Sequence, residues 1–203
     1  MRKDRRLVAA VSLAVVLLAA AGACSTGAPR PITSGEGLSP LPTVLLPPVE
    51  QIAPDTTALP RPVRIPDDPY APEPVTEIGS IEIPRIGLVH PLFSGVTLHN
   101  VDRGPSHWPG SAMPGQRGNA VVAGHRATHS RPFSRIHELR AGDLVVFSVA
   151  GARSTYRVTD SLVVRPADTW IADQTEATTA TLYACHPPGS ETHRYVVRLE
   201  LAT

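Results

Sequence analysis

The stretch T-L-Y-A-C-H-P-P-G, Thr181 to Gly189, contains the residues of this chain that are best suited to chemistry. A strand-like run ends in Cys185, His186 follows directly, and Arg194 comes nine positions after the cysteine. A cysteine in such a place can be a buried core thiol, a metal ligand or a nucleophile. The rest of the sequence decides among these three.

Alternation along an extended chain disfavours the core thiol. Thr181, Tyr183 and Cys185 share one face of a strand, and the apolar residues between them share the other. The thiol thus lies with polar side chains and next to a turn, which is a poor place for an inert cysteine. The other cysteine, Cys24, falls in an N-terminal targeting region, so no disulfide partner is expected in the folded part.

A reactive thiolate needs a basic partner, which is usually histidine. The eight histidines are His90, His99, His107, His125, His129, His137, His186 and His193. His125 is the strongest candidate, because it ends V-V-A-G-H-R, where a buried strand delivers the imidazole to the rim of a sheet. His186 projects to the side opposite Cys185 in an extended chain.

A zinc site built from Cys185, His125, His129 and His186 is an alternative that these residues leave open. The H-x-x-x-H spacing of His125 and His129 can bind metal when it is helical. Here the stretch G-H-R-A-T-H-S-R-P is turn-like, and the H-E-x-x-H motif is not present. We therefore expect neither a metal nor a cofactor.

Acyl transfer through a thiol also needs donors where the carbonyl oxygen becomes an oxyanion. Arg194 opens the last strand, so a hairpin-like return brings it back toward Cys185 with a charge that is kept at any relevant pH. Arg198 has the same strand parity but lies about 13 Å farther along, at roughly 3.3 Å per residue, and is expected on a solvated face. Arg126 and Arg131 are expected to be loop or wall residues.

Residues 76–203 are expected to form one mostly β domain that positions these side chains. The expected strands lie within residues 78–88, 119–125, 143–149, 154–164, 180–185 and 194–201, which are rich in β-branched and aromatic residues. Helical turns are expected only around residues 97–102 and 133–139. This spacing favours a small barrel or sandwich. The formal net charge of +1 provides no field that would draw nucleic acid.

The first 75 residues are expected to carry the domain rather than to belong to it. Residues 1–24 combine the basic flank M-R-K-D-R-R, an apolar run and small residues before Cys24, as export signals do. The run either remains as a signal anchor, or cleavage leaves Cys24 free for lipidation. Thirteen of the 22 prolines fall within residues 25–75, which predicts a disordered, semi-rigid linker. Both alternatives place the domain at the extracellular face of the membrane.

Together these motifs resemble the sortases, the cysteine transpeptidases of Gram-positive cell surfaces. T-L-Y-A-C-H-P, A-G-H-R and the arginine at the head of the last strand carry the resemblance. It extends through I-E-I-P-R-I-G-L, G-P-S-H-W-P-G-S-A-M-P-G-Q-R-G-N-A-V-V-A-G-H-R and F-S-R-I-H-E-L-R-A-G-D-L-V, and covers roughly residues 78–201. The form G-H-R-x-T-H-x-x-P-F with C-H-P is most similar to class E sortases of actinobacteria, with class F as the nearest alternative.

The resemblance implies an eight-stranded sortase-type β-barrel with short helices and three catalytic roles. Cys185 would attack the Thr–Gly carbonyl of an L-A-x-T-G or L-P-x-T-G sorting signal and form a thioacyl intermediate. His125 would protonate the leaving amine, and Arg194 would stabilise the oxyanion. Thr181 and Ala184 are expected to contact the substrate, and Ala184 stands where the family commonly has threonine. The acceptor is expected to be an amine of a peptidoglycan precursor or a pilin lysine.

A non-catalytic cell-wall-binding lipoprotein that retains the barrel is the alternative function. It predicts an unreactive Cys185 and a sorting peptide that binds without being cleaved. The transpeptidase predicts a covalent acyl adduct on the same thiol.

Overall fold

The computed structural model describes residues 58–202. The expected export signal, Cys24 and the linker up to residue 57 lie outside the described residues. Within residues 58–202, no helix has the length and hydrophobicity that crossing a membrane requires.

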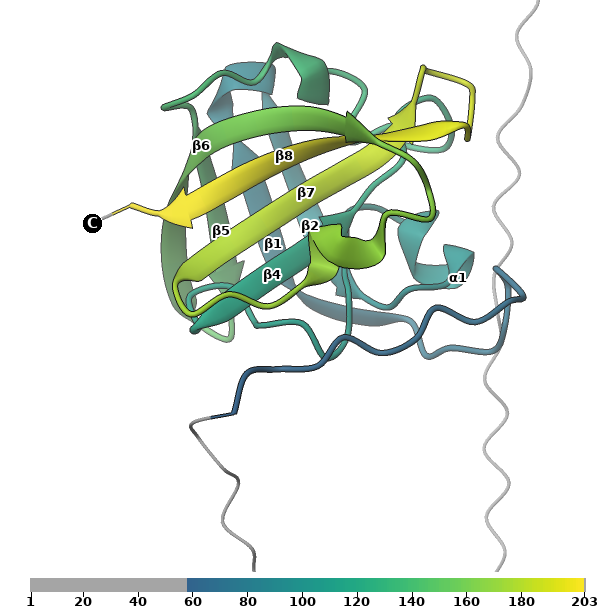
Figure 1. Cartoon of the computed structure of the whole chain (residues 1–203), viewed down its shortest axis with the longest axis horizontal. Helices are drawn as coiled ribbons and strands as arrows, with labels where there is room; N and C mark the ends of the chain where they lie inside the picture. The colour runs from purple at the N-terminus through teal and green to yellow at the C-terminus, as the bar shows by residue number, and fades with distance from the viewer. Residues whose placement is uncertain (1–57, 203) are drawn as a thin grey trace, which may run out of the picture. The chain divides into compact units, whose positions relative to one another are not determined.

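Eight strands close into a barrel, as the resemblance implies (Figure 1). They are β1 (Thr76–Ile83), β2 (Leu88–Ser94), β3 (Ser106–His107), β4 (Gly118–Ala123), β5 (Leu144–Val149), β6 (Ala152–Val164), β7 (Thr178–His186) and β8 (His193–Leu201). Around the barrel the order is β1-β2-β3-β4-β7-β8-β6-β5, and β5 pairs with β1 to close it. The pairs β2–β3 and β4–β7 are parallel. Because parallel strands end at the same edge of a sheet, β4 and β7 deliver the residues that follow them to one place.

Side chains that alternate inward along each strand fill the barrel. The main core consists of Ile81, Ile83, Ile86, Leu92, Ala120, Val122, Phe133, Ile136, Leu139, Val145, Phe147, Tyr156, Val158, Ala180, Leu182, Ala184, Val197 and Leu199. Strand β4 is buried on both faces: Ala120 and Val122 point into this core, while Val121 packs outside against Trp108. Burial of each such aliphatic side chain stabilises the fold by about 1.5–3 kcal/mol. Strand β4 is therefore held rigidly and positions the residues that follow it.

Helices are few and short, as expected. They are the 3-10 helix η1 (Pro84–Ile86), α1 (Leu98–Val101), and the 3-10 helices η2 (Ile136–Glu138) and η3 (Thr169–Ala172). The sequence predicts α1 and η2 but neither η1 nor η3. It also misses β2 and the two-residue β3, and it extends the first strand too far. Pro84 ends β1 instead of continuing it, because its fixed φ suits the first position of a helix.

Residues 58–75, called the strap below, lie against the barrel rather than forming a free spacer (Figure 1). Val63 is bonded on both sides: its N–H donates to the Pro109 carbonyl at 2.9 Å, and its carbonyl accepts from the Trp108 indole at 2.7 Å. Gly110 permits this approach, since a Cβ there would lie 2.2 Å from a carbonyl oxygen of the strap and φ is +78°. Specific contacts on the barrel hold the strap in place.

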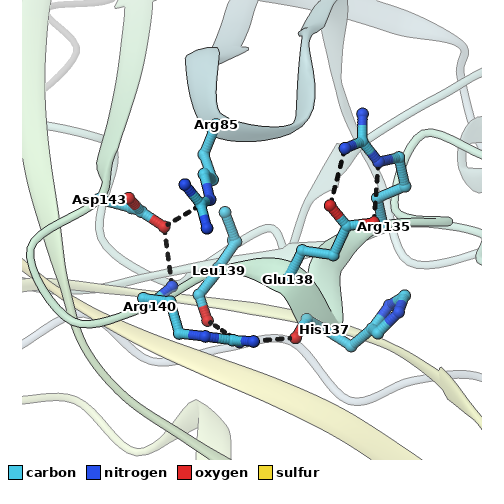
Figure 2. A network of polar contacts seen from close by, with 7 residues as sticks. All are labelled: Arg85, Arg135, His137, Glu138, Leu139, Arg140 and Asp143. Carbon is cyan, nitrogen blue, oxygen red and sulfur yellow. Dashed lines mark hydrogen bonds and ion pairs between the residues drawn. The ribbon is translucent and has the colours of Figure 1, made fainter.

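A network of polar contacts orders the segment that contains η2 and links it to Arg85 of η1 (Figure 2). Arg135 and Glu138 form a two-bond ion pair, with nitrogen–oxygen distances of 2.9 and 2.7 Å. Asp143 accepts from the backbone N–H of Arg140 at 2.8 Å and lies 3.8 Å from the guanidinium of Arg85. Exposed ion pairs contribute about 0–1 kcal/mol each, so this network orders the surface of the segment more than it stabilises the fold.

Candidate active site

Strands β7 and β8 place Cys185 and Arg194 side by side. The two residues are directly paired in the antiparallel ladder, as the expected hairpin-like return requires. Directly opposed residues of an antiparallel pair project to the same face, with Cβ atoms about 4.5–5.5 Å apart. The guanidinium therefore starts from the same face as the thiol.

The parallel pair β4–β7 carries His125 to the same edge. Ala123 is paired with Tyr183, and the N–H of Gly124 donates to the Tyr183 carbonyl at 3.1 Å. The chain then turns back, and the N–H of Phe133 donates to the His125 carbonyl at 3.0 Å. Gly124 is needed here because a Cβ would lie 2.5 Å from the Phe133 ring.

Cys185, His125 and Arg194 line one cavity of about 220 Å³. Its other walls are Ile65, Val96, Leu98, Val101, Trp108, Ala123, Gly124, Arg165, Pro166, Asp168, Thr169, Ile171, Tyr183 and Ala184. Most of these are apolar, so an extended peptide with small aliphatic side chains fits their chemistry. The three polar groups converge from segments that are up to 69 positions apart in the chain.

The guanidinium of Arg194 is held by carbonyl groups. Its Nη1 donates to the Glu191 carbonyl at 3.0 Å and to the His193 carbonyl at 3.1 Å. Among the described residues no carboxylate forms an ion pair with it, so its charge is available to a developing oxyanion. Tyr183 remains a neutral phenol beside the thiol, because burial raises its pKa to about 12.

A carboxylate that the sequence analysis missed lies against the candidate histidine. Asp102 Oδ1 is 2.7 Å from His125 Nε2, and Asp102 Oδ2 is 3.4 Å from His129 Nε2. The rings of His125 and His129 stack with their centroids 4.7 Å apart. No sequence signal identifies Asp102, because its 23-residue separation from His125 follows no motif.

The potential metal ligands group differently from the zinc alternative. Among the described residues, the set that could hold a metal ion is Asp102, His125 and His129, with ligand atoms within 4.8 Å of one another. Cys185 and His186 are not part of it. A metal here would occupy the imidazole that a Cys185 nucleophile needs as its base, so this set does not combine with the thiol in the way the alternative required.

Arg126 lies in the loop that follows β4, as expected, but it is buried, with 5% of its surface exposed. Its Nη1 lies 2.6 Å from His186 Nδ1, and its guanidinium lies over the Tyr195 ring, 5.3 Å from the centroid. Burial lowers the pKa of Arg126, and burial followed by the nearby Arg126 charge lowers the pKa of His186. His186 faces away from the cavity, as alternation predicts.

The two expected substrate contacts have different outcomes. Ala184 lines the cavity through the 2% of its surface that is exposed. Thr181 does not reach the cavity: it is 1% exposed, and its hydroxyl donates to Asn119 Oδ1 at 2.9 Å. Asn119 in turn donates to the carbonyls of Ile171 and Asp173, so the segment around η3 covers this face. The expected substrate contact of Thr181 is therefore wrong, since a long loop buries the residue.

The same segment contributes one wall of the cavity. Ile171 is 5% exposed, lines the cavity and packs against Val164 and Val196. Trp170 is 44% exposed and lies beneath the guanidinium of Arg198, 5.1 Å from its centroid. Arg198 is thus on the outer face and away from the thiol, as expected.

Comparison with known proteins agrees with this architecture. The family model described as Sortase domain matches residues 81–202. The chain is 30% identical over 132 residues to Sortase D of Bacillus subtilis (strain 168), which covers 63% of this chain and 65% of that protein. It is 29% identical over 141 residues to Sortase SrtE1 of Streptomyces coelicolor (strain ATCC BAA-471 / A3(2) / M145), covering 62% of this chain and 40% of that protein. The chain thus spans less than two thirds of the length of either relative.

A solved structure is similar as well. The T196V mutant of sortase E from Streptomyces avermitilis has a TM-score of 0.58 and 29% identity, over 63% of this chain and 89% of that chain. The sortase-domain match runs from within β1 to the end of β8 and so takes in the whole cavity-forming part of the barrel. This chain belongs to the sortase family.

Proposed function

We propose that the chain is a cysteine transpeptidase that uses Cys185 as nucleophile, His125 as acid and base, and Arg194 as oxyanion stabiliser. The observation that carries the proposal is that these three side chains line one cavity although they come from separate segments. A thiol, an imidazole and a guanidinium cation at one apolar groove are what acyl transfer from a peptide requires.

The reaction proceeds in two acyl transfers. The Cys185 thiolate attacks the Thr–Gly carbonyl carbon, and Arg194 stabilises the oxyanion of the tetrahedral intermediate. The carbon–nitrogen bond breaks, the glycine amine leaves with a proton from His125, and a thioester remains. An incoming amine then attacks the thioester and gives a proton to His125, the carbon–sulfur bond breaks, and the thiolate is restored.

The substrate we propose is a protein with a C-terminal signal of the L-A-x-T-G or L-P-x-T-G kind. The apolar walls around the thiol suit the aliphatic residues of such a signal. The acceptor is an amine of a peptidoglycan precursor or a pilin lysine. The domain works at the extracellular face of the membrane, held there by a signal anchor or by lipidation of Cys24.

The test is a covalent adduct on the purified full-length chain. Peptides carrying L-A-x-T-G or L-P-x-T-G are incubated with and without an amine, and intact-mass spectrometry measures acylation of Cys185. We expect a thioacyl adduct that the amine removes, with the peptide joined to the amine as product. Cys185→Ala removes the nucleophile and lowers the transfer rate by at least about 10⁴-fold, as in other enzymes that lose a catalytic nucleophile.

The control separates chemistry from folding. Thermal unfolding of Cys185→Ala should match the parent chain, because the side chain lies at the cavity surface and its loss creates little void. Peptide that binds but is never cleaved supports the wall-binding alternative. Cleavage that Cys185→Ala leaves intact rules out the proposed mechanism.

A further inference from the structure

The carboxylate of Asp102 determines which nitrogen of His125 can exchange a proton. Asp102 Oδ1 and His125 Nε2 are 2.7 Å apart, and their side chains are 19% and 16% exposed. An ionised carboxylate only accepts hydrogen bonds, so Nε2 keeps its hydrogen toward Asp102. The proton that moves during acyl transfer is then carried by Nδ1.

The other oxygen of this carboxylate is held by the strap. The Tyr70 hydroxyl donates to Asp102 Oδ2 at 3.1 Å, and this bond raises the pKa of the Tyr70 phenol. His129 Nε2 lies 3.4 Å from the same oxygen, and the His129 ring stacks on that of His125. The carboxylate is therefore held by Tyr70 and His129 in addition to the ring it orients.

The strap is docked on α1, the short helix that Asp102 directly follows. The N–H of Leu98 donates to the Pro69 carbonyl at 2.7 Å, and His99 Nε2 donates to the Tyr70 carbonyl at 3.0 Å. The rings of Tyr70 and His99 meet edge to face with centroids 5.6 Å apart. These contacts place the phenol beside the end of α1.

Glu73 fixes the other end of α1. Its carboxylate accepts from the N–H groups of Val96 and Thr97 at 3.0 and 2.9 Å, and from the Thr97 hydroxyl at 2.7 Å. It also accepts from Asn100 Nδ2 at 3.0 Å. Hydrogen bonding by these groups, which outweighs partial burial, lowers the pKa of Glu73. Both ends of α1 thus depend on residues that precede the first strand of the barrel.

We infer that Asp102 is a positioning residue for His125, and that the strap completes the active site by holding Asp102 through Tyr70. This inference rests on the proposed function. Asp102 touches neither the thiol nor the substrate in this scheme. It fixes the tautomer and the orientation of the imidazole, as carboxylate partners of catalytic histidines do.

Steady-state kinetics on the full-length chain test the inference. Asp102→Asn and Asp102→Ala should lower kcat by about 10-fold to 10³-fold and leave KM for the sorting peptide within about twofold, because the residue acts on proton transfer. Tyr70→Phe, which removes only the hydroxyl, should lower kcat by about three- to tenfold. The matched controls are Asp160→Asn, an exposed carboxylate on β6, and Tyr195→Phe, whose hydroxyl bonds to Ser161. Both should keep the parent kcat.

A second measurement does not depend on turnover. In ¹⁵N-histidine NMR spectra, His125 of the parent chain should show the Nε2–H tautomer, and Asp102→Ala should shift it to a mixture of tautomers. Unchanged tautomer signals, or a kcat of Asp102→Ala within twofold of the parent, overturn the inference. If the parent chain forms no thioacyl adduct, the proposed function fails, whereas the NMR result still decides whether Asp102 positions His125.

Discussion

His125 and Arg126 are neighbours in the chain, as are Cys185 and His186, yet each pair is divided between two clusters on opposite faces of the sheet. The outer cluster of Cys185, His125 and Arg194 opens into the cavity. The inner cluster of Arg126, His186 and Tyr195 lies toward the end of the barrel core. Cys185 and His186 are successive residues of β7 and therefore project to opposite faces, whereas His125 and Arg126 are separated by the irregular turn that follows β4.

The basic side chains of the two clusters have different surroundings. In the outer cluster a carboxylate, Asp102, lies 2.7 Å from the imidazole, and the Arg194 guanidinium lies on the cavity wall. In the inner cluster, Arg126 is buried against an aromatic ring and Nε has no hydrogen-bond partner among the described residues. A histidine and an arginine close to the cysteine are therefore not enough to form a candidate active site. A cavity and an acid partner distinguish the outer cluster.

The sharpest test of this distinction is Arg194→Ala. Loss of an oxyanion donor should lower kcat/KM by about 10²- to 10³-fold, while Arg194→Lys, which retains charge without the planar fork, should lose less. The readout is transfer of a sorting peptide to an amine. The matched control is Arg198→Ala on the same strand, which stacks on Trp170 and should retain activity. Equal losses in the two variants would contradict the assignment.

Gly124→Ala tests the packing that leads into the outer cluster. The new Cβ would lie 2.5 Å from the Phe133 ring, and overpacking of this kind costs about 1–3 kcal/mol. Chemical denaturation should show that loss of stability, and activity should fall as His125 is displaced. The double variant Gly124→Ala with Phe133→Leu should lose less stability than the sum of the two single variants, because both act on one contact. Strict additivity would place the clash elsewhere.

The inner cluster should tolerate a change that the outer one does not. Arg126→Met retains an unbranched side chain over Tyr195 and removes a buried cation that forms no ion pair with a carboxylate within residues 58–202. We expect the free energy of unfolding to change by less than about 1 kcal/mol or to rise, and kcat/KM to remain within about threefold. The pKa of His186, followed by NMR, should rise, since the Arg126 charge contributes to lowering it. A tenfold loss of transfer activity with an intact fold would show instead that Arg126 takes part in the reaction.

His107 lies outside both clusters and tests whether burial of a histidine makes the stability of this domain depend on pH. His107 is 2% exposed, and burial lowers its pKa below the ordinary value of about 6.5. The unfolded chain therefore takes up a proton at a higher pH than the folded chain. This contribution to stability is fully present above about pH 6.5 and is lost as the pH falls toward the lower folded pKa.

His107→Gln should consequently flatten the decrease of stability between about pH 6.5 and 5. The measurement is chemical denaturation of both chains at several pH values, with pH 8, where both forms of the histidine are neutral, as the internal reference. Parallel curves for the two chains would show that His107 is not the group responsible. This is the smallest of the expected effects.

Local pattern predicted the outer cluster well where strand parity decides the outcome. Cys185 and Arg194 were expected on one face from alternation and a hairpin return, and their pairing in β7–β8 confirms it. Parity failed for Thr181, which has the right face but is covered by the segment around η3. Alternation states which face a residue takes and does not state what packs upon that face.

Neither the carboxylate partner of His125 nor the docking of the strap could be predicted, because both depend on contacts between segments far apart in the sequence. Asp102 reaches His125 across 23 positions, and Tyr70 reaches Asp102 across 32, between segments without regular structure. Proline content predicted a disordered linker over residues 25–75, whereas the described part of it, residues 58–75, is bonded to the barrel. Docking depends on groups of the barrel itself, such as the Trp108 indole and the space at Gly110, which carry no signal for a distant proline-rich stretch.

By itself, the sequence determined the β class, the family resemblance and the three residues proposed for catalysis, because strand periodicity and short motifs are local properties of the chain. The tertiary structure decided that those residues share one cavity, that Asp102 lies against His125, and that the strap docks on the barrel. These facts arise from contacts between segments far apart in sequence, and only closure of the barrel brings such segments together.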